Sequence, residues 1–114
     1  MVQQGLENVP CQVEKAISLI GNKWSLFIIK ELHFKAQSMR FNELLRALKP
    51  ISSRTLSLKL KELLKYEIIE KNVVSTSPPH SEYNLTERGE ELTTVLTAMA
   101  EWNYKWYSTE DKNV

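Results

Sequence analysis

The sequence predicts a mainly α-helical domain that carries one small β-hairpin near its C-terminal end. Three observations lead to this prediction. Apolar residues recur at helical spacing along most of the 114 residues, strand-like composition appears only between residues 68 and 85, and Ser77-Pro78-Pro79 divides that region in two. With 42% hydrophobic and 25% charged residues, the chain suits one domain with a core of its own.

The composition also excludes several classes of protein. A single cysteine, Cys11, excludes an intrachain disulfide framework and a cysteine-rich zinc site. Gly and Pro, at 3 and 4 residues, exclude collagen-like chains. No apolar run approaches the roughly 18 residues of a membrane span, and the first ten residues carry no secretion signal. We therefore expect a cytoplasmic protein without a membrane partner.

Two apolar stripes predict the first two helices, and Gly21-Asn22 separates them. The first stripe consists of Val13, Ala16, Ile17 and Ile20, and the second of Trp24, Phe27, Ile28 and Leu32.

A third and a fourth helix follow, joined by a short turn at residues 49–51. The third carries Phe41, Leu44, Leu45 and Leu48, and Asn42 is its expected cap. Lys49-Pro50 ends it, because the residue before a proline avoids the helical region. Ser52 is expected to cap the fourth helix, with Ile51 packed on Leu56 as a hydrophobic staple.

The region after the fourth helix predicts a two-stranded hairpin. Residues 68–74 are rich in β-branched side chains, and residues 82–85 are short and extended. Thr86 is expected to cap a long last helix. A helix–turn–helix followed by a hairpin is the arrangement of a winged helix-turn-helix domain, to which residues 38–40 are candidates for a small third strand.

The fourth helix divides into two faces at about 100° per residue. Its core face holds Leu56, Leu60, Leu63 and Leu64, and its outward side holds Arg54, Leu58, Lys61 and Lys65, with Ser57 at the border. In a DNA major groove, Arg54 suits the two acceptors of guanine, Leu58 suits a thymine methyl, and the cations suit phosphates. The alternative is a basic face that is simply solvated, and the outward leucine argues against it.

The charges are unevenly distributed although the net charge is only +1. Residues 23–71 hold eleven Lys or Arg and five Glu, whereas the two flanks together hold four basic and nine acidic residues. A basic middle between acidic ends favours one surface that faces a polyanion.

Five motifs in this order resemble the signature of HxlR-type winged-helix transcription regulators, relatives of the MarR group. They are Cys11-Gln12-Val13-Glu14, Gly21-Asn22-Lys23-Trp24, Arg40-Phe41-Asn42-Glu43-Leu44, Ile51-Ser52-Ser53-Arg54-Thr55-Leu56 and Glu82-Tyr83-Asn84-Leu85-Thr86-Glu87-Arg88-Gly89. The resemblance covers roughly residues 11 to 106.

The resemblance implies a homodimeric transcription regulator that binds double-stranded DNA, with the fourth helix as reader and the hairpin as wing. Carried over residue by residue, it assigns DNA binding to Ser53, Arg54, Ser57, Leu58 and Lys61. The family often has a basic residue where His80 stands, after the wing prolines. A histidine is mostly neutral at neutral pH, so His80 is a candidate for a weaker or pH-sensitive phosphate contact, or has no role.

The terminal helices are expected to form the dimer interface. The last helix carries more large apolar side chains than a small core covers, and such patches usually mark an interface. The expected interface residues are Val13, Ile17, Leu92, Val95, Leu96, Met99, Trp102 and Trp106. A two-fold dimer would present two reading helices to a pseudo-palindromic operator. A last helix packed wholly in its own domain is the alternative. The expected boundaries are a tail at 1–10, the domain at 11–107 and a tail at 108–114.

Cys11 is a candidate redox or electrophile sensor. With Glu14 it has the spacing of a capping box, and a helix N-terminus favours the reactive thiolate. Some relatives in the resembled family sense oxidants through a cysteine at the matching position. Without a second cysteine, the products are an intersubunit disulfide, a mixed disulfide or an adduct. The alternative is a small buried residue without reactivity.

No cofactor, metal or enzymatic activity is expected. His33 and His80 lie in different elements, and three scattered glycines make no phosphate loop. A thiol-dependent enzyme acting through Cys11 is a distant alternative. A winged-helix module that binds only protein is a closer one, since fold does not dictate function. The operator, the effector and the direction of regulation are not predicted.

Overall fold

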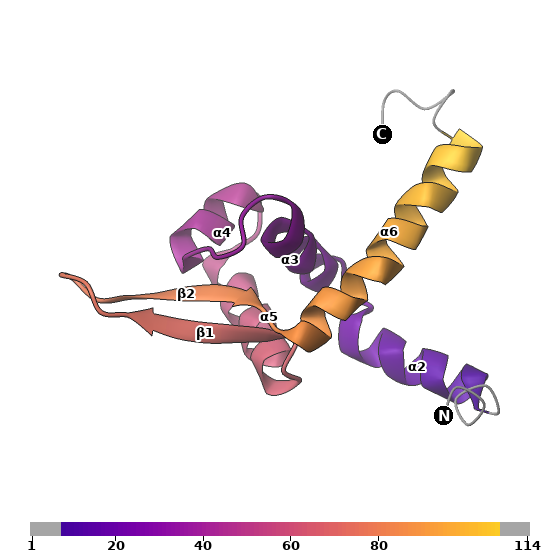
Figure 1. The fold of residues 1–114 in the computed structure, drawn as a ribbon, viewed down its shortest axis with the longest axis horizontal. Coiled ribbons are helices and arrows are strands. Elements are labelled where there is room, and N and C mark those ends of the chain that lie inside the picture. Colours follow the sequence, from indigo (N-terminus) through magenta and orange to yellow (C-terminus); the bar gives the residue numbers. More distant parts are fainter. Residues whose placement is uncertain (1–7, 108–114) are drawn as a thin grey trace.

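The computed structural model describes residues 8–107 and has the predicted order of four helices, a hairpin and a last helix (Figure 1). The helices are α2 (Val9–Ile20), α3 (Lys23–Phe34), α4 (Phe41–Ala47), α5 (Ser53–Lys65) and α6 (Glu87–Tyr107), and the strands are β1 (Ile69–Val74) and β2 (His80–Leu85). The predicted winged helix-turn-helix fold is thereby confirmed. The expected tail at 108–114 and residues 1–7 of the expected N-terminal tail lie outside the described residues.

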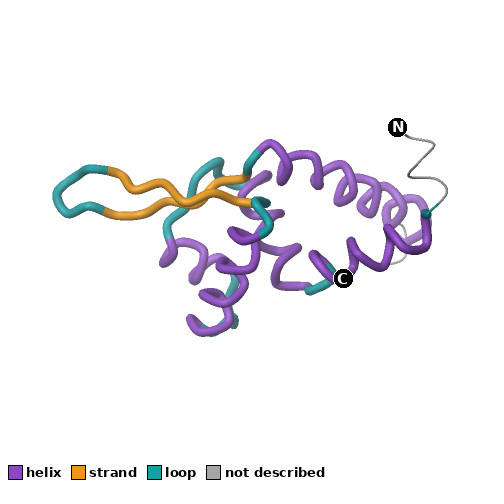
Figure 2. The backbone as a smooth tube through the Cα atoms, turned by 90° about the horizontal axis from the view of Figure 1, so that it is seen from below, coloured by secondary structure: helices purple, strands orange, loops and turns teal. Residues whose placement is uncertain are grey.

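The hairpin and the two terminal helices project from opposite sides of a central body (Figures 1 and 2). Strands β1 and β2 pair antiparallel, with Ile69 opposite Leu85 and Val74 opposite His80. The candidate third strand is a single bridge at Met39, whose backbone N–H and C=O both bond to Tyr83, at 3.0 and 2.8 Å. No helix within residues 8–107 is both long and apolar enough to cross a membrane.

Helix α3 lies at the centre of the core. It packs against α2, α4, α5, α6 and β2, and it contributes Ile28, Ile29 and Leu32, which are almost completely buried. The other buried apolar side chains come from the remaining helices, the hairpin and the segments that join them, and they are Met39, Leu44, Leu48, Ile51, Leu56, Leu60, Leu63, Ile68, Ile69, Tyr83 and Leu85. In α3, α4 and α5, apolar residues at helical spacing form the face that the helix buries.

Ser52 caps α5 as expected, since its hydroxyl oxygen accepts a hydrogen bond from the Thr55 backbone N–H at 3.0 Å. Thr86 caps α6 in the same way, through a 3.1 Å bond from the Gly89 N–H. Gly89 also permits a close approach of backbones, because a Cβ there would lie 2.1 Å from the carbonyl oxygen of Ile68. This contact holds the start of α6 against the base of the hairpin.

Two predicted helix starts are wrong. Asn42 lies inside α4, and the cap position is Arg40, whose backbone N–H donates to the Glu43 carboxylate at 2.8 Å. The first helix begins at Val9 after Asn8, with Pro10 in its first turn, whereas a capping box of Cys11 and Glu14 requires a helix that begins at Cys11. Cys11 therefore lies within α2, and the predicted capping box between Cys11 and Glu14 does not form. A proline is well suited to the first helical turn, because a backbone N–H at that position would have no acceptor within the helix.

The end of α5 places a glutamate in a backbone conformation that favours glycine. Glu67 has a φ of 61°, and its N–H and that of Ile68 bond back to Leu64 and Leu63 at 3.0 and 2.9 Å. This pair of bonds is a Schellman motif, in which glycine usually occupies the left-handed position. For a residue with a Cβ, that conformation costs about 1–2 kcal/mol.

We predict that Glu67→Gly raises the free energy of unfolding by about 1 kcal/mol, because glycine relieves the left-handed strain. Glu67→Ala is the matched control, since it also removes the exposed 3.7 Å ion pair with Arg88 but keeps a Cβ. Urea unfolding of both variants measures the difference. A glycine variant no more stable than the alanine variant would contradict the prediction.

Candidate nucleic-acid interface

The outward side of α5 carries the side chains that sequence reasoning assigned to DNA. We call it the basic face of α5, and it consists of Arg54, Ser57, Leu58, Lys61 and Lys65, with Ser53 at the start of the helix. All are exposed except Ser57, which is half-buried, and Leu58 is 49% exposed. On the other side of the helix, Leu56, Leu60 and Leu63 are at most 2% exposed.

This face has the chemistry for a major groove. Guanidinium donors form a fork that matches the two acceptors of guanine, whereas ammonium groups bind phosphates as point charges. An exposed leucine between cations offers an apolar contact to a thymine methyl. The structure thus brings together on one helix every sequence-predicted DNA-binding residue except His80.

His80 begins β2 and is held within the wing. Its Nε2 lies 2.9 Å from Oε2 of Glu82, and its Nδ1 lies 3.3 Å from the Thr76 hydroxyl. The other carboxylate oxygen of Glu82 accepts a hydrogen bond from the Ser38 hydroxyl at 2.7 Å. Hydrogen bonds from Ser38 and then His80 hold the pKa of Glu82 below its usual value. A phosphate contact by His80 would compete with this pair and stays a prediction.

Sequence reasoning missed Glu82, which ties the wing to the segment before α4. The available signal was its spacing from His80, since residues two apart on a strand share a face. Ser38 comes from a distant part of the chain, so the sequence carried no local sign of its bond to Glu82.

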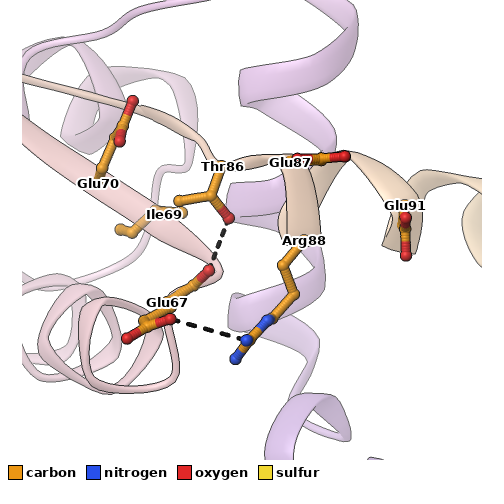
Figure 3. Close-up of a pocket in the computed structure, with 7 residues that line it drawn as sticks. All are labelled: Glu67, Ile69, Glu70, Thr86, Glu87, Arg88 and Glu91. Atoms are coloured by element: carbon orange, nitrogen blue, oxygen red, sulfur yellow. Dashed lines mark hydrogen bonds and ion pairs between the residues drawn. The ribbon is translucent and has the colours of Figure 1, made fainter.

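An acidic hollow of about 580 Å³ lies where the base of the hairpin meets α6 (Figure 3). Its exposed carboxylates are Glu67, Glu70, Glu87 and Glu91. Arg88 is the one cation that lines it, and this guanidinium is occupied by the carbonyl oxygen of Tyr66 at 3.1 Å and by Glu67. Phosphates are repelled from such a surface, so this side of the hairpin is unsuited to DNA.

The terminal helices expose most of the residues predicted for a dimer interface. None of the twelve residues of α2 is buried in the described chain, and Val13 and Ile17 are 48% and 60% exposed. On α6, the exposed members of the predicted set are Val95, Met99, Trp102 and Trp106. Leu92 and Leu96 differ, because they are half-buried against the core.

The remaining candidates lie apart from each other. Cys11 is exposed on α2. His33 lies on α3, where its Nδ1 is 2.9 Å from the Glu90 carboxylate of α6. Within residues 8–107, no three His, Cys, Asp or Glu side chains gather as metal ligands would.

Residues 19–111 match the family model described as HxlR-like helix-turn-helix. An uncharacterized HTH-type transcriptional regulator of Synechocystis is 40% identical over 100 residues, which are 88% of this chain and 73% of that protein. The family-model match therefore spans the helix–turn–helix, the hairpin and all of α6.

Solved structures of regulators share the fold. A MarR-family transcriptional regulator from Enterococcus faecalis superposes with a TM-score of 0.78 at 31% identity, over 89% of this chain and 90% of the other. The reduced form of the regulator YodB from Bacillus subtilis gives 0.76 at 34% identity, over 88% and 96%. The diamide-treated form of YodB gives 0.70 at 35% identity, over 83% and 92%.

Proposed function

The chain belongs to the HxlR-like helix-turn-helix family, whose named relatives are transcriptional regulators, and we propose that it controls transcription by binding an operator in double-stranded DNA as a homodimer. The observation that carries the proposal is the two-sided α5. Burial of its leucines presents Arg54 and Lys61 outward together, on the second helix of a helix–turn–helix. The protein would thus act by binding rather than by catalysis.

The exposed apolar side chains of α2 and α6 support the dimer. Trp102 and Trp106 are both 58% exposed, and one turn separates them on α6. Large apolar patches on a single chain usually mark an interface. A two-fold axis between the terminal helices would place two copies of α5 for half-sites about one turn of DNA apart, on a pseudo-palindromic operator.

We also propose that Cys11 senses oxidants or electrophiles. Its thiol is exposed on α2 in the single chain, so the alternative of a residue buried within its own domain is not supported. In support, YodB, which shares this fold, has been solved in a reduced form and after treatment with diamide, which is a thiol oxidant. A modification on α2 would act on DNA binding by changing how the two chains pack.

A module that binds only protein is the alternative to a DNA-binding regulator. The two differ in salt dependence, because contacts with phosphates make affinity for a duplex fall steeply as salt rises. A protein-only module would bind little duplex at any salt concentration.

We predict that Arg54→Ala weakens operator binding by about 1–3 kcal/mol, because it removes a guanidinium that forks onto a base. Genomic fragments that the protein retains supply the operator, and a titration measured by fluorescence anisotropy gives the dissociation constant. Lys15→Ala, a loss of the same charge on the side of α2 away from Val13 and Ile17, is the control. Unchanged affinity in a folded Arg54→Ala variant would remove Arg54 from the reading role.

The proposed dimer leads to a prediction about the mass of the protein in solution. Light scattering at micromolar concentration should give twice the 13.3 kDa mass of the chain. Met99→Asp should shift the mass toward the monomer, because it places a charge among the exposed apolar side chains of α6. Thr94→Asp, on the outer side of the same helix, should leave the dimer intact. A wild-type mass of 13.3 kDa would refute the dimer.

A further prediction concerns Cys11. Diamide oxidises two thiols to one disulfide and is itself reduced to the hydrazine, so treatment should link two chains or, with a small thiol present, cap each one. Operator affinity of the treated wild type should change, whereas Cys11→Ser should bind alike before and after treatment. Non-reducing electrophoresis and mass spectrometry identify the product. Identical DNA binding by treated and untreated wild type would make Cys11 structural only.

A further inference from the structure

A second basic site lies away from the basic face of α5, between α4 and the hairpin. It is a hollow of about 490 Å³, which we call the wing hollow. Four basic side chains from different segments line it: Arg40 before α4, Arg46 on α4, Lys71 on β1 and His80 on β2. Arg40, Arg46 and Lys71 are all exposed.

The strand register explains why these distant residues meet. The backbone of Met39 pairs with Tyr83, and Tyr83 pairs in turn with Lys71, so these residues form one row across the sheet. Arg40 directly follows that row at the start of α4. The Lys71 ammonium extends over the Tyr83 ring, 6.0 Å from its centre, toward the same hollow.

The carboxylates near the wing hollow are already occupied. Glu43, which also lines the hollow, accepts the backbone N–H of Arg40, and Glu82 is held by Ser38 and His80. Within the described residues, neither Arg40, Arg46 nor Lys71 has a carboxylate oxygen within 4.0 Å. Arg40, Arg46 and Lys71 outnumber the two carboxylates, so the hollow keeps a net positive charge that favours an anion.

We propose that the wing hollow binds a backbone phosphate of the DNA duplex that α5 reads, with Arg40, Arg46 and Lys71 as its ligands. The inference rests on the proposed function and adds a contact site that lies outside α5. When the second helix of a helix–turn–helix enters the major groove, the first helix crosses the sugar–phosphate backbone. Here α4 is that first helix, and Figure 1 shows it beside the hairpin, on the body side of the wing tip.

A phosphate in the wing hollow would position the duplex without reading its sequence. It would bridge α4 and strand β1 of the hairpin, and thereby set the angle of the wing relative to α5. The acidic hollow at the other end of the hairpin would repel a phosphate, so the two hollows together orient the backbone along the wing.

The test is a salt titration of binding to the operator and to a random duplex of the same length. Arg46→Ala and Lys71→Ala should each weaken both duplexes by the same several-fold factor. The Arg46→Ala/Lys71→Ala double variant should reduce the slope of log K against log salt by about 1, since it removes the one phosphate contact that the hollow makes, and each single variant should reduce the slope by less. Arg46→Lys, which keeps the charge, should retain most of the slope. Lys15→Ala, on α2, should change binding to neither duplex. Thermal melts followed by circular dichroism confirm that the variants fold.

The outcomes separate this inference from the proposed function. If the wild type binds duplexes with a steep salt slope and the Arg46→Ala/Lys71→Ala double variant keeps that slope, the phosphate site is wrong while DNA binding stands. A loss confined to the operator would also overturn it, because a phosphate contact is indifferent to sequence. A wild type that binds neither duplex at low salt overturns the proposed function itself.

Discussion

Burial of the leucine face of α5 against α3 is the contact on which the rest of the candidate interface depends. Leu56, Leu60 and Leu63 are removed from water almost completely, which contributes roughly 1.5–3 kcal/mol for each side chain. Because the residues of a helix are fixed at about 100° intervals, this burial also determines what faces outward. A rotation of α5 that hid Arg54 would expose leucines to water, so the core itself holds the basic face in place.

Hydrogen bonds also fix both ends of α5. At the N-terminus, the Ser52 hydroxyl satisfies a backbone donor next to Arg54, where a recognition helix makes its base contacts. At the C-terminus, the Schellman motif turns the chain through Glu67 directly into the hairpin. The strained glutamate therefore sits at the joint that sets the direction of the wing, and its carboxylate lines the acidic hollow.

The sequence predicted those features that depend on residues close together in the chain. The spacing of leucines revealed both faces of α5, and Ser52 was recognisable as a cap from its neighbours alone. Asn42 was wrongly predicted as the cap of α4, because the Glu43 carboxylate instead accepts the backbone N–H of Arg40. That earlier helix start follows the bridge between Met39 and Tyr83, which joins segments far apart in the chain. The wing hollow escaped prediction for the same reason, since strand register brings its cations together. The helical wheel alone was enough to place Leu58 and Lys65 on the outward side of α5.

The position of α3 determines how the terminal helices can influence α5. Helix α3 packs against α2, α5 and α6 at once, and its buried Ile28 and Ile29 leave little room for independent movement on either side. At its C-terminal end, the 2.9 Å pair between His33 and Glu90 ties it to the first turns of α6. Helix α6 also contacts β2 at the base of the wing. A change in the packing of α2 and α6 in a dimer would therefore reach the basic face of α5 through α3 and reach the wing through β2. Helix α5 and the wing would then move together, because α4 and α5 form one helix–turn–helix and α4 lines the wing hollow together with the hairpin.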